Sequence, residues 1–389
     1  MTVIWTPTLD EESIRWRAAA QQLTQQQFAP LADEIDQAQR YPEEHLPHLL
    51  SSGISGMFLP KAYGGSGASL VALSAVVETI AAGCASTAAI MAALSLGAFP
   101  VLLGGNEEQK QSLLGGLAKR GEAVNFALSE RGAGSDAGSV ETTAVREESG
   151  QWRIQGEKCW LGNGGHSKHF IVFARTGEAG TRNNVTAFWV PRDTPGALVD
   201  FYEDKMGIRG TTTTNLKLDG VLVPHSSIVG EEGAGLKLAL STLNVGRIVV
   251  AAQALGIAQC AFSAAAAFAA TRTTFGKPII DHQGIGFKLA DGATQLSAAR
   301  MMLYAAAAAY DRGEDISALG AMTKLYASEV SHKVCDDAVQ VLGGRGYVKP
   351  HAVERCYRDQ RITEIYEGTS EIQRVVIARA IKRDVAQAA

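Results

Sequence analysis

The chain has 389 residues, of which 46% are hydrophobic and 20% are charged, and its formal net charge is -4 at pH 7. A chain of this length can bury a large core in two or three domains, and the lack of a basic excess argues against nucleic acid as a partner. The five cysteines show no CxxC spacing and the eight histidines no metal-ligand spacing, so we expect no metal site and a reducing, cytoplasmic location. Residues 1–15 contain no basic segment followed by an apolar one, so we expect no signal peptide.

The first part of the chain, residues 11–120, is predicted to be helical. Apolar residues recur at helical spacing from Ile14 to Ile35, and Pro30 is expected to kink that helix. Asn106 stands where it can cap a further helix, which we expect to end near Gly121.

Two uncharged stretches, Thr79 to Asn106 and Ile248 to Thr271, are long enough to cross a bilayer. Both are rich in Ala, Ser, Gly and Thr rather than in Leu and Ile, and they contain Pro100 and Gln253. We therefore expect buried helices of a large core and no membrane span.

Between Ala123 and Val229 the sequence contains short β-rich runs that turn residues separate. The predicted strands begin near Asn125, Trp152, His169, Asn184 and Asn215. Because no helices alternate with these runs, an antiparallel sheet or barrel is favoured over a doubly wound sheet.

From Leu236 onward the chain is again predicted to be helical, in long segments at 236–271, 283–311, 315–342 and 370–386. Long helices with short connections are typical of a bundle. The predicted fold is therefore an α+β multidomain protein with an N-terminal α-helical domain (1–122), a central antiparallel β-barrel domain (123–235) and a C-terminal four-helix bundle domain (236–389).

One segment near the C-terminus, Arg361-Ile-Thr-Glu-Ile-Tyr-Glu-Gly-Thr-Ser-Glu-Ile-Gln-Arg374, places a glutamate ahead of a helix. Ser370 and Gln373 have capping-box spacing, so a helix is predicted to begin at Ser370. Glu367 lies just before it, next to Gly368, where a ligand can approach the backbone closely. A glutamate there could act as a positioned base, although a surface glutamate at an acidic helix start is the commoner explanation of such a pattern.

Three other features have ordinary explanations when they are considered alone. Gly132-Ala-Gly-Ser-Asp-Ala-Gly138 is one residue too long for the dinucleotide-binding fingerprint and lacks the βαβ surroundings, so it is interpreted as a loop. Trp160 lies in an apolar strand, as core tryptophans do. Arg272 ends a long helix, where the helix dipole favours a cation.

Several long motifs follow one another along the chain. They are Pro60-Lys-Ala-Tyr-Gly-Gly-Ser-Gly67, Ala127-Leu-Ser-Glu-Arg-Gly-Ala-Gly-Ser-Asp136, Met206-Gly-Ile-Arg-Gly210, Arg272-Thr-Thr-Phe-Gly276, Gln340-Val-Leu-Gly-Gly-Arg-Gly-Tyr347 with Glu354-Arg355 and Arg358-Asp359, and the segment around Glu367. Together they resemble the signatures of the acyl-CoA dehydrogenase family, and the short-chain and branched short-chain branch is the most similar.

The resemblance implies an FAD-dependent enzyme of fatty acid metabolism. Its reaction would be the α,β-dehydrogenation of a saturated acyl thioester, a short- or branched short-chain acyl-CoA, to the trans-2-enoyl thioester. Glu367 would remove the α proton and flavin N5 would accept the β hydride. Burial by bound substrate would raise the pKa of Glu367, whereas the helix N-terminus behind it would lower that pKa.

The resemblance also implies the residues of the site. The FAD-binding residues would be Phe126, Leu128, Ser129, Gly134, Ser135, Trp160, Leu161, Gly162, Arg272, Phe275, Gln283, Gln340, Gly343, Gly344, Thr369, Ser370 and Glu371. The substrate would contact Ser135, Asn244, Arg247, Tyr366 and Gly368. FAD would be shared between subunits of a homo-oligomer, a tetramer in this family, and an electron-transfer flavoprotein would accept the electrons.

The sequence departs from the family pattern at three positions: Gly162 replaces a hydroxyl residue, Asn244 an aspartate, and Gly286 a glutamine. Because of Asn244, an acyl group tethered to a carrier protein remains an alternative substrate. Because of Gly162, a flavin oxidase or monooxygenase of the same fold, which uses oxygen, remains an alternative function. A non-catalytic helical interaction protein is a further alternative, which the absence of any cofactor would favour. Some branches carry the base at the position of Gly246, which cannot act here, so Glu367 is the predicted base.

Overall fold

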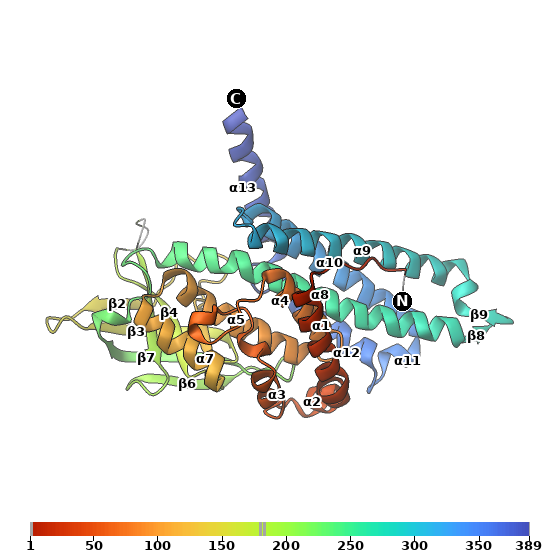
Figure 1. Ribbon diagram of the computed structural model, residues 1–389, viewed down its shortest axis with the longest axis horizontal. Helices are drawn as coiled ribbons and strands as arrows, with labels where there is room; N and C mark the ends of the chain where they lie inside the picture. Colours follow the sequence, from red (N-terminus) through yellow and green to blue (C-terminus); the bar gives the residue numbers. More distant parts are fainter. Residues whose placement is uncertain (1–2, 179–180, 182–183, 389) are drawn as a thin grey trace.

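The computed structural model describes residues 3–178, 181 and 184–388. A helical part, a β part and a second helical part follow one another along the chain (Figure 1), and this confirms the predicted fold class. The predicted boundary at 122 lies in a connection and that at 235 falls on the first residue of a long helix, Gly235–Thr271; both stay predictions. The N-terminal helices are α1 (Glu11–Leu23), α2 (Ala32–Ala38), α3 (His45–Ser51), α4 (Leu70–Ala81), α5 (Ala85–Gly104), α6 (Glu107–Gln109) and α7 (Gly115–Arg120).

Local signals in the first part act as the sequence predicts. The kink at Pro30 is a 3-10 turn, Ala29–Leu31, because proline cannot donate the backbone hydrogen bond of a continuing helix. Asn106 and Gln109 form a reciprocal capping box at the start of α6. Gly121, with φ 69°, follows the end of α7.

The central part is a curled seven-stranded sheet. Its strands are β1 (Val124–Ala127), β2 (Thr143–Arg146), β3 (Trp152–Gly162), β4 (His169–Arg175), β5 (Val185–Pro191), β6 (Ala197–Tyr202) and β7 (Thr213–Val223). The order is β1-β4-β2-β3-β7-β6, with β5 also on β4. The prediction of a purely antiparallel sheet was wrong in two pairings, because β1 and β2 both run parallel to β4.

The strands β2 and β6 were not predicted from the sequence. The strand β2 has only four residues, and β6 lies at the edge of the sheet with most of its residues exposed. Neither strand therefore shows the alternation of apolar and polar residues by which a half-buried strand is recognised.

The C-terminal part is built around one long helix, α8 (Gly235–Thr271), which packs against α4, α5, α9, α10 and α12. The other elements are β8 (Thr273–Thr274), β9 (Lys277–Pro278), α9 (Gln283–Asp311), α10 (Ser317–Leu342), α11 (Gly344–Tyr347), α12 (Ala352–Gln360) and α13 (Ser370–Ala388). Three of the four predicted bundle helices pack together, whereas α13 contacts α10 and then projects from the body (Figure 1).

The two uncharged stretches form α5 and part of α8. Both helices are long and apolar enough to cross a membrane by length and composition, but 67% and 78% of their most apolar windows are buried inside the protein. This burial is what core helices of a large protein show. The helix α5 also packs directly on β1, because a Cβ at Gly97 would lie 1.8 Å from the Val124 carbonyl oxygen.

Candidate active site

The turn that carries Glu367 connects the 3-10 helix Arg361–Glu364 to α13. Glu367 has φ 56°, a left-handed backbone that a residue with a long side chain rarely adopts. The helix begins at Ser370 as predicted, but the predicted capping box was wrong. The cap is Thr369, whose Oγ1 accepts from the Ile372 N–H at 3.4 Å. The buried Gln373 amide instead donates to the carbonyl oxygens of Glu367 and Gly368, at 3.1 and 2.7 Å, and so holds the turn from below.

The Glu367 side chain lies against the middle of α8. A Cβ placed on Gly246 would be 2.7 Å from Glu367 Oε2 and 3.3 Å from the side chain of Leu96. Glycine at 246 is therefore what makes room for the carboxylate. Within the described chain, Glu367 Oε2 is buried and has no hydrogen-bond partner, so it is available to accept a proton or a hydrogen bond from a ligand.

The electrostatic surroundings prepare Glu367 for proton transfer near neutral pH. Burial raises the pKa of this carboxyl to about 7, while the nearby positive charges of Arg247 and Lys324 hold it lower than burial alone would. A base with a pKa near the working pH is effective in general base catalysis.

One face of α5 connects this carboxylate to the strand segment Trp160–Gly162. Leu96 is the nearest α5 residue to Gly246, and Ala93, one turn earlier, is the nearest residue to a Cβ at Gly162, at 3.9 Å. Because residues three apart lie on one face of a helix, α5 forms a common wall for the base and for the strand predicted to lie along the flavin.

The predicted flavin loop leaves the end of β1 and is anchored by a buried ion pair. Lys158 Nζ lies 2.6 Å from Glu130 Oε1 and also donates to the Leu128 carbonyl at 3.1 Å. Burial lowers the pKa of Lys158 to about 8, against the pull of the Glu130 charge. Glu130 also accepts backbone N–H bonds from Glu141 and Thr142, so one carboxylate closes the loop at both ends. The predicted contacts Phe126, Leu128, Ser129, Gly134 and Ser135 belong to this anchored segment.

The residues predicted to hold the flavin ring leave room for a planar, polar ligand. Trp160 has φ 58° and is 50% exposed, at an interruption of the β3–β7 register. Apart from Gly134 itself and its two chain neighbours, no atom of the described residues lies within 4 Å of a Cβ built on Gly134. Ser370 Oγ, beside Thr369 and Glu371, is buried without a partner in the described chain. An exposed aromatic face, an open backbone and an unpaired hydroxyl fit the FAD expected from the sequence.

The remaining predicted FAD residues gather at the opposite end of α8. Phe275 is 96% exposed with φ 49°, between β8 and β9, and Arg272 and Gln283 flank it. The Arg345 guanidinium lies 5.9 Å from the Phe268 ring, which brings the end of α10, with Gln340, and the start of α11, with Gly343 and Gly344, to the same end.

The separation of the two groups follows from helix geometry. From Gly246 to Thr271, α8 rises about 38 Å, and Figure 1 shows β8 and β9 far from the central sheet. A single chain therefore does not bring the two groups of predicted FAD residues together.

The three positions that depart from the family pattern have different surroundings, and those of Gly286 explain its glycine. A Cβ at Gly286 would lie 2.8 Å from the Ile280 carbonyl oxygen, so the backbone packs too closely there for a glutamine. Gly162, in contrast, has space around it, and its carbonyl accepts from Asn125 Nδ2 at 2.7 Å. Asn244 accepts from Arg247 Nη1 at 2.7 Å, and Arg247 is buried rather than presented at the surface.

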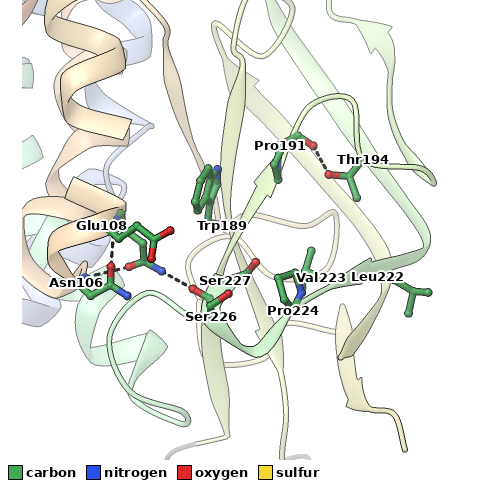
Figure 2. A pocket seen from close by; sticks show the side chains of 11 residues that line it. Asn106, Glu108, Trp189, Pro191, Thr194, Leu222, Val223, Pro224, Ser226 and Ser227 are labelled. Carbon is green, nitrogen blue, oxygen red and sulfur yellow. Dashed lines mark hydrogen bonds between the residues drawn. The ribbon is translucent and has the colours of Figure 1, made fainter. Parts of the chain in front are cut away.

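A surface hollow of about 260 Å³ lies away from this site, between α6 and the strands β5 and β7 (Figure 2). Gln109, which borders it, donates to the carbonyls of Ser226 and Ile228 and so ties α6 to the sheet. None of the predicted site residues lines this hollow in the described structure.

Sequence reasoning missed three polar side chains that support the site: Lys158, Gln253 and Lys324. Each is fully buried. Tyr366 Oη donates to Gln253 Oε1, and Lys324 Nζ donates to the Gly368 carbonyl at 2.7 Å. A polar residue inside an otherwise apolar helix, such as Gln253 among alanines, is the one signal that the sequence offered.

Three family models match the chain in order. They are the N-terminal domain (residues 10–121), middle domain (125–221) and C-terminal domain (233–382) of acyl-CoA dehydrogenase. The probable acyl-CoA dehydrogenase FadE25 of Mycobacterium tuberculosis is 44% identical over 376 residues, which cover 96% of each chain. The mitochondrial short-chain specific acyl-CoA dehydrogenase of Bos taurus is 41% identical over 97% of this chain and 92% of its own. The solved structure of butyryl-CoA dehydrogenase from Megasphaera elsdenii matches with a TM-score of 0.94 and 38% identity, covering 97% of this chain and all of its own.

Proposed function

The chain belongs to the acyl-CoA dehydrogenase family of FAD-dependent oxidoreductases, and we propose that it converts a saturated short- or branched short-chain acyl-CoA to the trans-2-enoyl thioester, with Glu367 as the base. The observation that carries this proposal is the buried, unpaired carboxylate oxygen of Glu367, in a carboxyl whose pKa is about 7. It has both the location and the protonation behaviour of a base for a weakly acidic C–H group.

In this mechanism the chain binds the thioester between Glu367 and the segment Trp160–Gly162. The Glu367 carboxylate takes the proton from the α carbon. The backbone N–H of Glu367 donates to the thioester carbonyl oxygen, where negative charge develops. Bound FAD supplies the acceptor for the hydride that leaves the β carbon as the double bond forms. Ser135, Asn244, Arg247, Tyr366 and Gly368 are proposed to contact the substrate.

A polar residue in the α8 wall supports a short acyl chain. Gln253 lies two turns along α8 from Gly246, on the same face, and is fully buried. Its Oε1 accepts from the Tyr366 hydroxyl, while its Nε2 has no partner among the described residues. Because Gln253 is already fully buried here, a long alkyl chain could extend past it only by breaking the Tyr366–Gln253 hydrogen bond and leaving buried polar atoms without partners, which is unfavourable.

The test is the Glu367→Gln variant, assayed with a series of acyl-CoA and acyl-carrier-protein thioesters and an artificial electron acceptor. Glutamine keeps the shape of the side chain but cannot take the proton, so we expect a loss of turnover of about 10²-fold or more with FAD retained. Near-normal turnover in this variant would reject the assignment of the base. If the wild-type enzyme prefers the acyl-carrier-protein thioester, the carrier protein would take the place of CoA in the proposed substrate.

A second candidate function is a flavin oxidase or monooxygenase that uses oxygen, and the observation that favours it is Gly162. This position offers no side-chain hydroxyl, and the space beside it is open to the Ala93 methyl group at 3.9 Å. Anaerobic bleaching by an acyl-CoA followed by slow reoxidation in air would support the dehydrogenase. Fast reoxidation would support the oxidase.

The proposed assembly is a cytoplasmic homotetramer that passes its electrons to an electron-transfer flavoprotein. The separation of the two groups of FAD residues along α8 supports an oligomer, because a second copy could bring Arg272 and Phe275 to the cofactor. All five cysteines are free thiols, which is compatible with a reducing compartment.

A further inference from the structure

The turn that carries Glu367 and Gly368, called the catalytic turn below, has two buried cations near it, one from α8 and one from α10. Lys324 of α10 is fully buried, and its Nζ donates to the Gly368 carbonyl at 2.7 Å. Arg247 of α8 is 4% exposed; its Nη1 donates to Asn244, and its Nε has no partner in the described part of the chain. Each cation acts electrostatically on Glu367.

The neighbouring acids do not neutralise these two cations. Glu364 lies near Lys324 but is already paired with Arg361 and with His332. Glu371 is exposed at the start of α13. Tyr366 is the other titratable group of the turn; burial raises its pKa, so it stays neutral. The buried part of the site therefore combines two cations with the single carboxylate of Glu367.

Building on the proposed function, we propose that Lys324 is a positioning residue for the base. Its ammonium group fixes the catalytic turn through the Gly368 carbonyl and, together with Arg247, holds the Glu367 carboxylate in its ionised, proton-accepting form. Asn244 contributes to the same electrostatic effect. Because it is neutral, the Arg247 charge acts on Glu367 instead of being balanced by a carboxylate at 244.

The physical argument is a competition between burial and charge. Burial disfavours the ionised carboxylate, whereas an opposite charge within a few ångströms lowers the pKa of an acid by about 1–3 units. With both cations in place the pKa of Glu367 is about 7. Removing either charge should raise it, and the ionised fraction at neutral pH should fall.

The experiment compares the pH dependence of kcat/KM in wild type, Lys324→Gln and Lys333→Gln, with a short-chain acyl-CoA as substrate. Glutamine at 324 keeps an N–H donor, on a side chain one atom shorter than that of lysine, but has no charge. We expect the acidic limb of its profile to move up by about one pH unit, with FAD content unchanged. Lys333, exposed on the same helix, is the matched control and should keep the wild-type limb. An unmoved limb in Lys324→Gln would overturn the proposal, because a role in holding the turn alone does not shift it.

Asn244→Asp tests the same idea without touching Lys324. An aspartate would pair with Arg247 and weaken its field at Glu367, so this limb should also move to higher pH. If Lys324→Gln does not fold, the result for Asn244→Asp is decisive. An acidic limb that stays at the wild-type pH in Asn244→Asp would then contradict the proposal.

Unfolding gives a readout that does not require turnover. Because the pKa of Glu367 is raised from 4.5 to about 7 in the folded chain, stability is lost as the pH rises between these values. Glu367→Gln should therefore gain stability relative to wild type across this window, and in the Lys324→Gln background the gain should continue to higher pH. Near-normal turnover of Glu367→Gln would reject the proposed function itself. If Glu367→Gln is inactive but its gain in stability covers the same pH range in wild type and in the Lys324→Gln background, only the role of Lys324 is rejected.

Discussion

At the scale of single residues, three of the six non-glycine residues with positive φ in the described chain are predicted site residues. These three are Trp160, Phe275 and Glu367. Such conformations persist only where the surroundings enforce them, and they concentrate at functional sites. The motifs are what led to the prediction of these three residues. They could not reveal Lys324, because a lysine in a helix is ordinarily at the surface and its burial arises only when α10 packs under the turn.

The Gly246→Ala variant tests the contact between α8 and the base. A methyl group there would lie 2.7 Å from Glu367 Oε2, so the carboxylate must move away. A displacement of about 1 Å at a reacting group can lower turnover by about 10²-fold, whereas the flexible end of the Glu367 side chain can move aside at little cost in stability. The measurements are kcat and the midpoint of thermal unfolding.

Gly292→Ala in α9 is the matched control. A Cβ at this helical glycine makes only ordinary contact with the Phe262 ring, at 3.4 Å, so turnover should be retained. If Gly246→Ala also kept wild-type kcat, the carboxylate would not need the position that the structure gives it.

At the scale of elements, the sequence predicted the long periodic helices and the strands with buried faces, because hydrophobic periodicity reports burial directly. It did not predict the edge strand β6 or the parallel pairing of β1 with β4, since pairing partners depend on contacts distant in sequence. The helix α12 shows another long-range feature. Arg358 bonds Asp36 of α2 at 2.7 Å as well as Glu354 of its own helix, and α12 leads through the 3-10 helix Arg361–Glu364 into the turn that carries Glu367.

Replacing Arg358 with Met should strongly destabilise the protein. Asp36 would remain largely buried without its partner, and breaking such a pair typically costs about 3–5 kcal/mol. We expect a clear fall in the midpoint of chemical denaturation and partial recovery in the double variant Arg358→Met/Asp36→Asn.

Arg374→Met provides the comparison, because Arg374 and Glu329 form an exposed pair at 2.6 Å that should contribute about 0–1 kcal/mol. Equal losses of stability in Arg358→Met and Arg374→Met would show that the buried α2–α12 ion pair contributes no more than an exposed pair.

At the scale of the whole molecule, α13 lies far from the hairpin of β8 and β9 (Figure 1), and it leaves the body with apolar residues exposed. Ile381 and Val385 lie one turn apart on this helix, 56% and 64% exposed. Exposed apolar stripes on a projecting helix are typical of surfaces that a partner covers. A contact with a second copy that covers these residues could not be predicted from the sequence, because it would be no part of the fold of one chain.

The Ile381→Asp variant tests this arrangement. A charge in the middle of the stripe should separate the subunits and release FAD, which light scattering and flavin absorbance would report together. Gln387→Asp, on the other side of the same helix, should keep both mass and colour. A wild-type protein that is monomeric and yet fully loaded with FAD would contradict the shared site.

The close approach at Gly246 limits how this enzyme can change over evolutionary time. Positions 246 and 367 compete for one small volume, so a carboxylate can occupy it from either backbone but not from both. Transferring the base to α8 would require Gly246→Glu and Glu367→Gly together, because each substitution alone leaves either a crowded volume or an empty one. A lineage that relocates its base must therefore cross an inactive intermediate or acquire both substitutions at once.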